Sequence, residues 1–322
     1  MTYRGGVNTT TDIVSEIKAL KVAKNAVILA HNYERPEVQD IADFVGDSLG
    51  LSRKAAATSA ERIVFCGVHF MAETASILSP DKKILLPDLN AGCSLAATIT
   101  ADELRTWKAK HPGAVVVSYV NTTAEVKAET DYCCTSSNAV KVVQSIPADK
   151  EILFLPDMFL GAYVKKITGR ENMRIWAGEC HVHAGIRPED MKAVRAEHPK
   201  AEFLIHPECG CASATMLFAQ ENPDAFQDAK LLSTEGMVNY AASSPSKEFL
   251  IATETGIMHR MELLNPDKKF YPVNRKAICQ FMKMITLPKI LRSLQEDVFE
   301  VKVPKATADK ARLAIERMVA IG

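Results

Sequence analysis

Short apolar runs recur along the chain and alternate with longer segments of mixed polarity. Runs of this kind are typical of strands that are buried on both faces of a parallel sheet. They cover residues 25–30, 62–66, 83–86, 114–119, 151–155, 173–176, 202–205, 230–232, 248–252 and 269–273. Segments with helical character separate most of them, at 49–57, 102–110 and 139–144, and a further helix is predicted from about Thr11, its predicted N-cap, to Leu20. The alternation predicts an α/β architecture with parallel sheets, whose functional residues lie in loops after the strand ends.

Polar residues after the strands recur at fixed spacings. A histidine or tyrosine ends a strand, a serine follows seventeen residues later, and a cysteine follows after a further 44 or 45 residues. The matched pairs are His31 with Tyr119, Ser48 with Ser136, Met71 with Met158, and Cys93 with Cys180. The spacing therefore indicates two repeats of about 87 residues.

A third repeat begins at His206, where the later landmarks are all displaced by one amount. Thr234, Met258 and Cys279 each lie about eleven residues further along than the first two repeats would place them. One insertion within residues 210–228 explains all three offsets. We therefore predict three similar α/β/α domains with small parallel sheets around a pseudo-threefold axis. Their predicted bounds are 1–110 with an N-terminal helix, 111–197, and 198–322 with the insertion and a C-terminal helix.

The three matched cysteines would meet at one point if the repeats close around such an axis. Cys93, Cys180 and Cys279 each follow the last strand of their repeat. Three thiolates form a metal centre with one open coordination position, and soft sulfur ligands favour zinc or an iron–sulfur cluster. His31, Tyr33, His206 and Glu208 lie on neighbouring loops and could perform acid/base chemistry beside an open Lewis-acid position.

Composition adds limits to this prediction. Hydrophobic residues make up 47% of the chain, and the 39 basic and 39 acidic residues cancel. This balance favours a globular protein and gives no indication of nucleic-acid or membrane-surface binding. The N-terminus lacks the apolar segment of a signal peptide, and no stretch approaches the roughly 20 apolar residues of a membrane span. We therefore expect a cytoplasmic protein, in which the eight cysteines are thiols or metal ligands.

Seven stretches together resemble the quinolinate synthase family. They are His31-Asn32-Tyr33, Gly46-Asp47-Ser48, Tyr119-Val120-Asn121-Thr122, residues 135–139 (TSSNA), residues 178–183 (GECHVH), His206-Pro207-Glu208 and residues 279–284 (CQFMKM). The resemblance implies a [4Fe–4S] enzyme built from three similar α/β domains. Such an enzyme condenses iminoaspartate with dihydroxyacetone phosphate to quinolinate, releasing phosphate and water, in NAD biosynthesis. L-aspartate oxidase would supply the iminoaspartate.

The resemblance also implies roles for individual residues. Cys93, Cys180 and Cys279 would hold the cluster and leave one iron open. Some members carry a Cys-x-x-Cys-x-x-Cys run at the last ligand, where this chain has Val273 and Lys276. Glu208, His206, Tyr33 and His31 would be catalytic, and the substrate-binding set would be His31, Ser48, Tyr119, Asn121, Ser136, His183, His206, Glu208 and Thr234.

Several of these residues also have structural interpretations. Ser48, Ser136 and Thr234 each precede a predicted helix, where a hydroxyl residue is commonly an N-cap. We interpret the three landmark methionines as core residues, Cys66, Cys133 and Cys134 as packing residues, and His181 as packing. Cys209 and Cys211 form a CxC pair that could bind metal or respond to redox. Glu179 and Lys283 either orient ligands or form surface ion pairs.

Two other function classes compete with the cluster-dependent synthase. A zinc hydrolase would use cysteine and histidine ligands around Cys180, and an electron-transfer protein would carry a cluster without a substrate. Zinc sites usually place ligand pairs at tight spacing, whereas these cysteines are 87 and 99 residues apart. Electron-transfer clusters usually have four cysteines. Three matched cysteines beside histidine, glutamate and tyrosine favour the synthase.

Overall fold

Three four-stranded sheets of the same topology make up the fold. The structure is a computed structural model that describes residues 10–210, 212 and 229–321. The first sheet contains β1 (Ala26–His31), β2 (Phe44–Gly46), β3 (Arg62–Cys66) and β4 (Lys83–Leu85); the second β5 (Val115–Tyr119), β6 (Tyr132–Cys134), β7 (Ile152–Leu155) and β8 (Met173–Ile175); the third β9 (Glu202–Ile205), β10 (Lys230–Leu231), β11 (Glu248–Ala252) and β12 (Lys269–Pro272). We name these sheets and their helices the first, second and third units.

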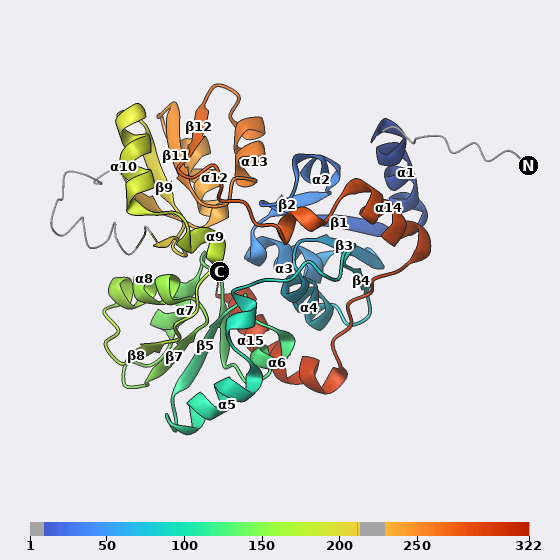
Figure 1. Cartoon of the computed structure of the whole chain (residues 1–322). Helices are drawn as coiled ribbons and strands as arrows, with labels where there is room; N and C mark the ends of the chain where they lie inside the picture. Colours follow the sequence, from blue (N-terminus) through green and yellow to red (C-terminus); the bar gives the residue numbers. More distant parts are fainter. Residues whose placement is uncertain (1–9, 211, 213–228, 322) are drawn as a thin grey trace, which may run out of the picture.

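Strand order is the same in all three units. The second strand lies at one edge, followed by the first, the third and the fourth, as in β2-β1-β3-β4. Every strand pair within these sheets is parallel. Figure 1 shows the units as three lobes around a common centre. The predicted fold of three similar α/β/α domains is therefore confirmed.

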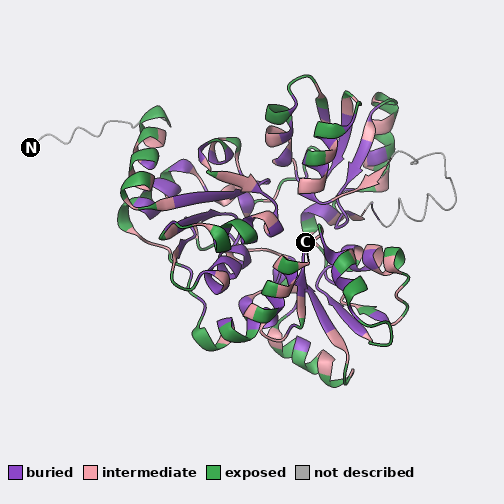
Figure 2. Cartoon of the chain, turned by 180° about the vertical axis from the view of Figure 1, so that it is seen from behind, coloured by how far each residue is buried: buried purple, intermediate pink, exposed green. Residues whose placement is uncertain are grey.

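The central strands are buried because helices cover both faces of each sheet. All residues of β7 are buried, and so is β1 after its first residue. Continuous apolar sequence is what such strands require, and it explains the runs seen in the sequence. In Figure 2 the strands are mostly buried, whereas the exposed residues lie on the outer sides of the helices. The core is therefore divided among the three sheets.

The helices follow the strands. They are α1 (Thr10–Ala23), α2 (Pro36–Ile41), α3 (Ser48–Ala57), α4 (His69–Leu78), α5 (Ala101–Ala109), α6 (Ala124–Lys127), α7 (Ala139–Ser145), α8 (Met158–Thr168), α9 (His181–Ala184), α10 (Pro188–Glu197), α12 (Thr234–Ser243), α13 (Ile257–Leu264), α14 (Leu287–Glu296) and α15 (Lys305–Ala320). Short 3₁₀ turns lie at Ala96–Thr98 and Met282–Met284, shortly after Cys93 and Cys279. Thr11, predicted as an N-cap, lies inside α1.

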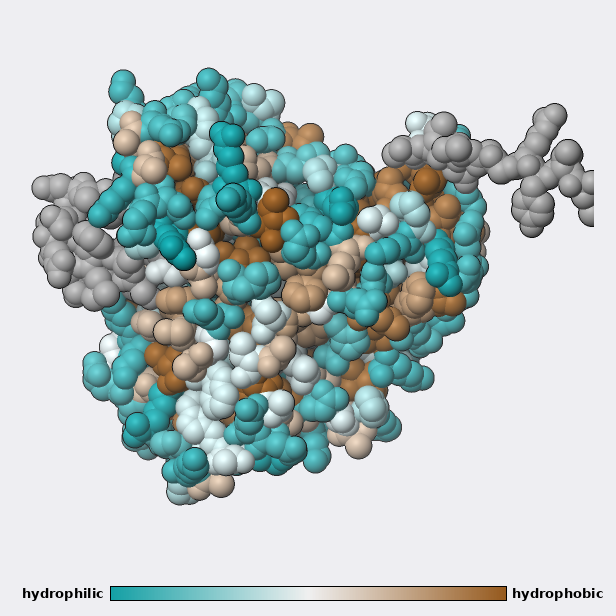
Figure 3. All heavy atoms as spheres, viewed as in Figure 1, coloured by the Kyte–Doolittle hydropathy of each residue, from teal (hydrophilic) through white to brown (hydrophobic). Residues whose placement is uncertain are grey.

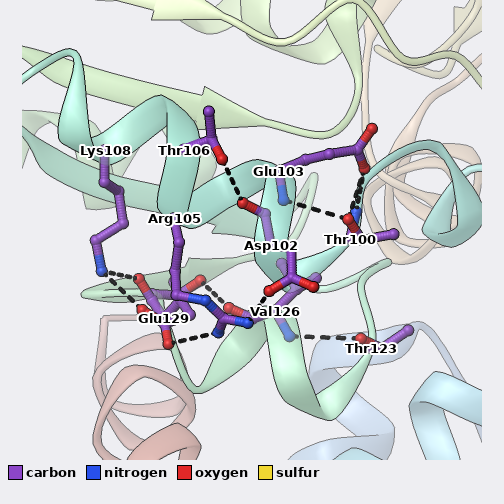
Figure 4. A network of polar contacts seen from close by, with 10 residues as sticks. Thr100, Asp102, Glu103, Arg105, Thr106, Lys108, Thr123, Val126 and Glu129 are labelled. Atoms are coloured by element: carbon purple, nitrogen blue, oxygen red, sulfur yellow. Dashed lines mark hydrogen bonds and ion pairs between the residues drawn. The ribbon is translucent and has the colours of Figure 1, made fainter.

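Helix α5 is fixed at its start by a capping box and along its side by ion pairs. Thr100 and Glu103 exchange hydrogen bonds between side chain and backbone at the N-terminus. Arg105 and Lys108 then pair with Glu129, just after α6, at 3.0 and 3.2 Å (Figure 4). These charges are largely exposed, so each pair contributes little stability. Their contribution is to hold α5, which leads into the second unit, against α6.

The last two helices return to the first two units. Helix α14 packs on α1 and β3, and α15 packs on β6 and α6 of the second unit and on α4 and α3 of the first. The predicted domain bounds remain a prediction, and the structure adds that this C-terminal segment joins the first two units together. Hydrophilic side chains prevail over the outer parts of the molecule, and hydrophobic ones show between the lobes (Figure 3).

Other residues singled out in the sequence have these positions. Cys66, Cys133 and Cys134 are fully buried, as expected for packing residues. Met71 is buried and Met258 is half-buried, but Met158 is 38% exposed because it begins α8 at the surface, so its assignment to the core was wrong. The predicted insertion falls mostly outside the described residues. In the described part of the chain, no helix combines the length and apolar character needed to cross a membrane.

Candidate active site and metal centre

One cavity lies at the carboxyl ends of all three sheets, where the units meet. Each unit contributes a residue at or just after the end of its first strand, a residue after its second strand and the cysteine after its fourth strand. All the residues predicted for the site line this cavity: His31, Tyr33, Ser48, Cys93, Tyr119, Asn121, Ser136, Cys180, His183, His206, Glu208, Thr234 and Cys279. Parallel strands direct their carboxyl ends to one edge, so the repeat itself brings these loops together.

The three cysteines are partly buried and face the same cavity. Burial raises the pKa of each thiol, and burial together with the nearby Cys279 raises the pKa of Cys93 to about 12. Lys283 lowers the pKa of Cys279, but burial outweighs this effect. Such a set of thiols becomes thiolates when a metal centre supplies the compensating charge.

Two buried carboxylates support the cysteine loops. Glu254 Oε1 accepts a hydrogen bond from the backbone N–H of Cys279 at 3.1 Å. Asp157 caps α8 by accepting from Leu160 N–H at 2.7 Å, and it also accepts from the N–H of Cys180. Both carboxylates stand two residues after the third strand of their unit. The first unit has Val68 at this position.

His31 and His206 occupy equivalent positions and share a fixed tautomer. Nδ1 of His31 accepts from Tyr33 N–H at 3.2 Å, and Nδ1 of His206 accepts from Glu208 N–H at 3.4 Å. A neutral ring that accepts at Nδ1 carries its proton on Nε2. Burial lowers the pKa of His31 to about 3 and that of His206 well below its ordinary value. Both rings are therefore neutral hydrogen-bond donors, and His206 Nε2 lies 3.1 Å from the hydroxyl of Ser136.

Glu208 is an acid of the cavity whose pKa is raised into the range near neutral pH. Burial, and then the charge of Asp157, raise its pKa to about 8, partly offset by a hydrogen bond from Tyr119. Its Oε2 lies 3.1 Å from His183 Nδ1 and 3.6 Å from His206 Nδ1. A carboxyl with this pKa can both give and take a proton near neutral pH.

Tyr33 and His183 share a hydrogen-bond partner in Thr253. His183 Nε2 lies 2.8 Å from Thr253 Oγ1, and the Tyr33 hydroxyl makes a short contact with the same oxygen. Burial and the charge of Glu208 raise the pKa of Tyr33 well above its ordinary value, so its phenol stays protonated. His183 also stacks on His206 with ring centres 5.0 Å apart.

The predicted hydroxyl residues are not helix caps. The side chains of Asp47 and Ser233 cap α3 and α12, and Asn138 is the residue before α7. Ser48 and Thr234 are instead the first residues of their helices, and Ser136 lies in the loop before α7. The N-cap interpretation was therefore wrong, and these hydroxyls face the cavity. Asn121 also lines it, with a buried Oδ1 that has no hydrogen-bond partner in the described structure.

A comparison with protein families shows to which family the chain belongs. Residues 15–320 match the family model described as "Quinolinate synthetase A protein". The chain belongs to this family.

Its relatives in the quinolinate synthetase A family are similar over nearly their whole length. Proteins named quinolinate synthase from Thermus thermophilus and from a Mycobacterium species are 57% and 56% identical, over 96% and 97% of this chain and 97% and 93% of theirs. One from Mycobacterium tuberculosis is 53% identical over 99% of this chain and 91% of its own. The resemblance stated from the motifs is confirmed, and the chain is a member of a family of enzymes.

Within this family fold, sequence reasoning missed several groups that contact the site. Thr253, Glu254 and Asp157 follow the third strands of the second and third units. A polar residue at this position in two of three repeats was the available signal. His181 was expected to pack, but it is exposed, lines the cavity and contacts Ser94 Oγ at 2.6 Å. That expectation was wrong because α9 is a single turn whose buried side is occupied by Val182 and His183.

The remaining sequence candidates have different environments. Lys283 pairs with Glu254 at 3.0 Å and donates a short hydrogen bond to the carbonyl of Tyr33, so it contributes to the site's frame. Glu179 is exposed. Cys209 is buried, whereas Cys211 lies outside the described residues, so the role of the CxC pair remains a prediction.

Proposed function

We propose that this chain is a quinolinate synthase, which condenses iminoaspartate with dihydroxyacetone phosphate and releases phosphate and water. One observation carries the proposal: three equivalent loops each bring a cysteine to a cavity that also holds Glu208, His206, His31 and Tyr33. Relatives of that name at 53–57% identity support it. A protein that only transfers electrons has no need for this acid/base lining.

Cys93, Cys180 and Cys279 would hold a [4Fe–4S] cluster through three thiolates. The donor set fits because it is soft, lines one cavity and leaves one coordination position without a protein ligand. The compact single-ion group found among the described residues contains only Cys180 of these three, so the cysteines as a set are spaced for a centre larger than one ion. When bound, the cluster supplies an open iron that acts as a Lewis acid on a hydroxyl or carbonyl.

Glu208 is the proposed general acid and base. Enolisation, imine exchange and loss of water all require proton transfer, and a carboxyl with a pKa of about 8 is matched to that task near neutral pH. His183 Nδ1, at 3.1 Å, can exchange a proton with it. Tyr33, kept protonated by burial, provides a second donor next to the same histidine.

The remaining polar groups are suited to holding anionic substrates. His31 and His206 present Nε2–H donors, and neutral rings can donate without the cost of a buried charge. Ser48 and Thr234 begin α3 and α12, where a hydroxyl and free backbone N–H groups together favour a carboxylate or phosphate. Asn121 adds a side-chain amide whose Oδ1 is unpaired among the described residues.

Apolar residues also form part of the cavity wall. Val68, Phe70, Met71, Phe281 and Met282 contribute to it. Such a lining excludes water and strengthens each electrostatic contact with substrate. It would also protect an imine substrate from hydrolysis. We include in the proposal that iminoaspartate comes from an L-aspartate oxidase, that the product enters NAD biosynthesis, and that the protein is cytoplasmic.

An anaerobic assay tests the proposal. Protein purified without oxygen is expected to be brown and to contain about four iron and four sulfide per chain. With dihydroxyacetone phosphate, and iminoaspartate generated in place from L-aspartate by an oxidase, it should form quinolinate. Protein without the oxidase is the control. A fully loaded protein that forms no quinolinate, or a protein freed of other metals that assembles no cluster when iron and sulfide are supplied, would contradict the proposal.

A further inference from the structure

One compact group of metal-binding atoms exists in the cavity besides the set of three cysteines. One ligand atom each from Cys180, His183 and Glu208 lies within 4.8 Å of the other two. His183 Nδ1 is 3.3 Å from Cys180 Sγ and 3.1 Å from Glu208 Oε2. Ligand atoms around a tetrahedral zinc ion lie roughly 3.3–3.8 Å apart, given the usual bond lengths of about 2.0–2.3 Å. The two distances therefore come close to those of a formed site.

The histidine of this group is already oriented as a metal ligand. Its Nε2 lies 2.8 Å from Thr253 Oγ1, which can accept the ring N–H. The proton then stays on Nε2, and the lone pair of Nδ1 points to the thiol and the carboxyl. A ligating histidine is normally held by such a hydrogen bond from its other nitrogen. Thr253 thus has the position of an outer partner of the site.

The charges of the group also match a divalent ion. All three side chains are in an environment where burial opposes separate charges, since His183 and Glu208 are 3% exposed. A dication with one thiolate, one carboxylate and one neutral imidazole is neutral overall. Binding would release the thiol proton and the carboxyl proton, and the cavity leaves a fourth position open for water. Cysteine, histidine and carboxylate are all zinc ligands.

We propose that, in the cluster-free chain, Cys180, His183 and Glu208 bind a single Zn²⁺ ion, and that this ion excludes the iron–sulfur cluster. Exclusion rests on the proposed function, because Cys180 would serve both centres. The zinc site itself does not rest on it. The two sites differ in their other ligands: zinc uses His183 and Glu208, whereas the cluster uses Cys93 and Cys279. Zinc would in addition occupy the carboxylate of Glu208, which could then no longer act as the proposed general acid and base.

Zinc binding to cluster-free protein tests the site without reference to activity. Full-length chain is freed of iron and sulfide with a chelator under anaerobic conditions and titrated with Zn²⁺ in a calorimeter. We expect one ion per chain and release of two protons, measured by comparing buffers of different ionisation enthalpy. Co²⁺ should give the absorption of a tetrahedral site with one thiolate. Wild-type protein that binds no zinc would overturn the proposal.

Matched variants separate this site from the set of three cysteines. Cys180→Ser and Glu208→Gln should weaken zinc binding more than about 100-fold, whereas Cys93→Ser should bind zinc like the wild type although it cannot hold a cluster. Thr253→Val should lose about 10–100-fold, as outer hydrogen-bond partners of metal ligands do, and Thr253→Ser should keep the affinity. Weakened zinc binding in Cys93→Ser together with wild-type affinity in Glu208→Gln would mean that the thiols alone bind the ion, and would refute the assignment.

Exclusion is tested by reconstitution. Zinc-loaded wild-type chain should take up no iron and sulfide until a chelator removes the zinc, whereas zinc-free chain takes them up. Cluster assembly at the same rate with zinc bound would overturn the exclusion. If zinc-free wild-type chain also fails to assemble a cluster, the proposed function fails, while the calorimetric result on the zinc site stands independently.

Discussion

One carboxylate oxygen of Glu254 accepts a hydrogen bond from the backbone N–H of Cys279, and the same oxygen forms an ion pair with Lys283. Its second oxygen accepts the N–H of Gly256 at 2.6 Å. Lys283 in turn donates to the carbonyl of Tyr33. A single buried ion pair thus fixes both a cysteine loop of the third unit and a tyrosine of the first.

Breaking this pair should destabilise the protein. In Glu254→Gln the ammonium group of Lys283 remains mostly buried without its countercharge, which typically costs about 3–5 kcal/mol of unfolding free energy. Urea unfolding of the cluster-free protein measures the change. The double variant Glu254→Gln/Lys283→Met is the control and should recover part of the loss. An unchanged urea midpoint in the single variant would show that the pair contributes nothing.

The assigned cysteine ligands are expected to differ sharply from the packing cysteines. Cys279→Ser should lower iron and sulfide to background, because a hydroxyl is a poor ligand for a soft metal centre. Cys133→Ala is the matched control, since Cys133 is fully buried in β6 and does not line the cavity. Metal analysis of anaerobically purified protein checks both. A full cluster in Cys279→Ser would remove this residue from the ligand set.

Replacing Glu208 by a residue of the same shape should abolish proton transfer without affecting assembly of the cluster. Glu208→Gln should retain the iron and sulfide of the wild type and lose about 10²–10⁴-fold in quinolinate formation, because an amide cannot transfer the proton. The assay is the anaerobic condensation described above, normalised to cluster content. Turnover within a few-fold of the wild type would exclude Glu208 as the proton-transfer group.

The loop before Cys180 should tolerate no side chain at Gly178. A Cβ there would lie 2.5 Å from the carbonyl oxygen of Pro156 and closer still to Thr98 Oγ1. Gly178→Ala should therefore cost about 1–3 kcal/mol and displace the cysteine loop. Gly92→Ala, next to Cys93, meets no atom nearer than 3.8 Å and should be neutral. Thermal unfolding and iron content compare the two, and equal behaviour would contradict the argument.

Stability should fall in acid partly through Asp297. Hydrogen bonds from Arg62, with Nε 3.1 Å away, hold the pKa of this carboxyl below its ordinary value. A lowered folded-state pKa contributes stability above the unfolded pKa of about 3.9, and this contribution is lost as the pH falls through the folded value. Asp297→Asn keeps a residue suited to its positive φ of 54°. It should cost about 1 kcal/mol near neutral pH.

Urea titrations at neutral pH and below pH about 3 check this dependence. The difference between wild type and Asp297→Asn should shrink toward zero in acid. A difference that stays constant over this range would mean that the asparagine changes packing rather than charge.

The repeat could be recognised in the sequence, and the repeat predicted most of the residues that line the site. Equal spacing of His31 with Tyr119 and of Cys93 with Cys180 was enough to predict one cavity, because parallel strands of equal order place equivalent loops at equivalent positions. The strands β2 and β6 were missed, although β4 and β8, which are equally short, were predicted. The cap residues Asp47 and Ser233 were missed by one position.

Other features depend on packing between the units, which cannot be predicted from a local sequence pattern. Thr253 gains its importance only by lying between Tyr33 and His183 from two other units. His181 and His183 are two residues apart, yet the single turn of α9 exposes one and buries the other. Asp157 and Glu254 each stand two residues after the third strand of their unit, but Val68 at this position in the first unit hides the repeat, and only the methionines were matched after that strand.

The division of the three thiols among three separately built units has a consequence for biosynthesis. No unit alone can chelate the proposed centre, because each supplies one sulfur, and α15 packs on both of the first two units. Cofactor loading would therefore report on assembly: a product whose units have not come together offers one or two sulfurs at the site and is left without the cluster.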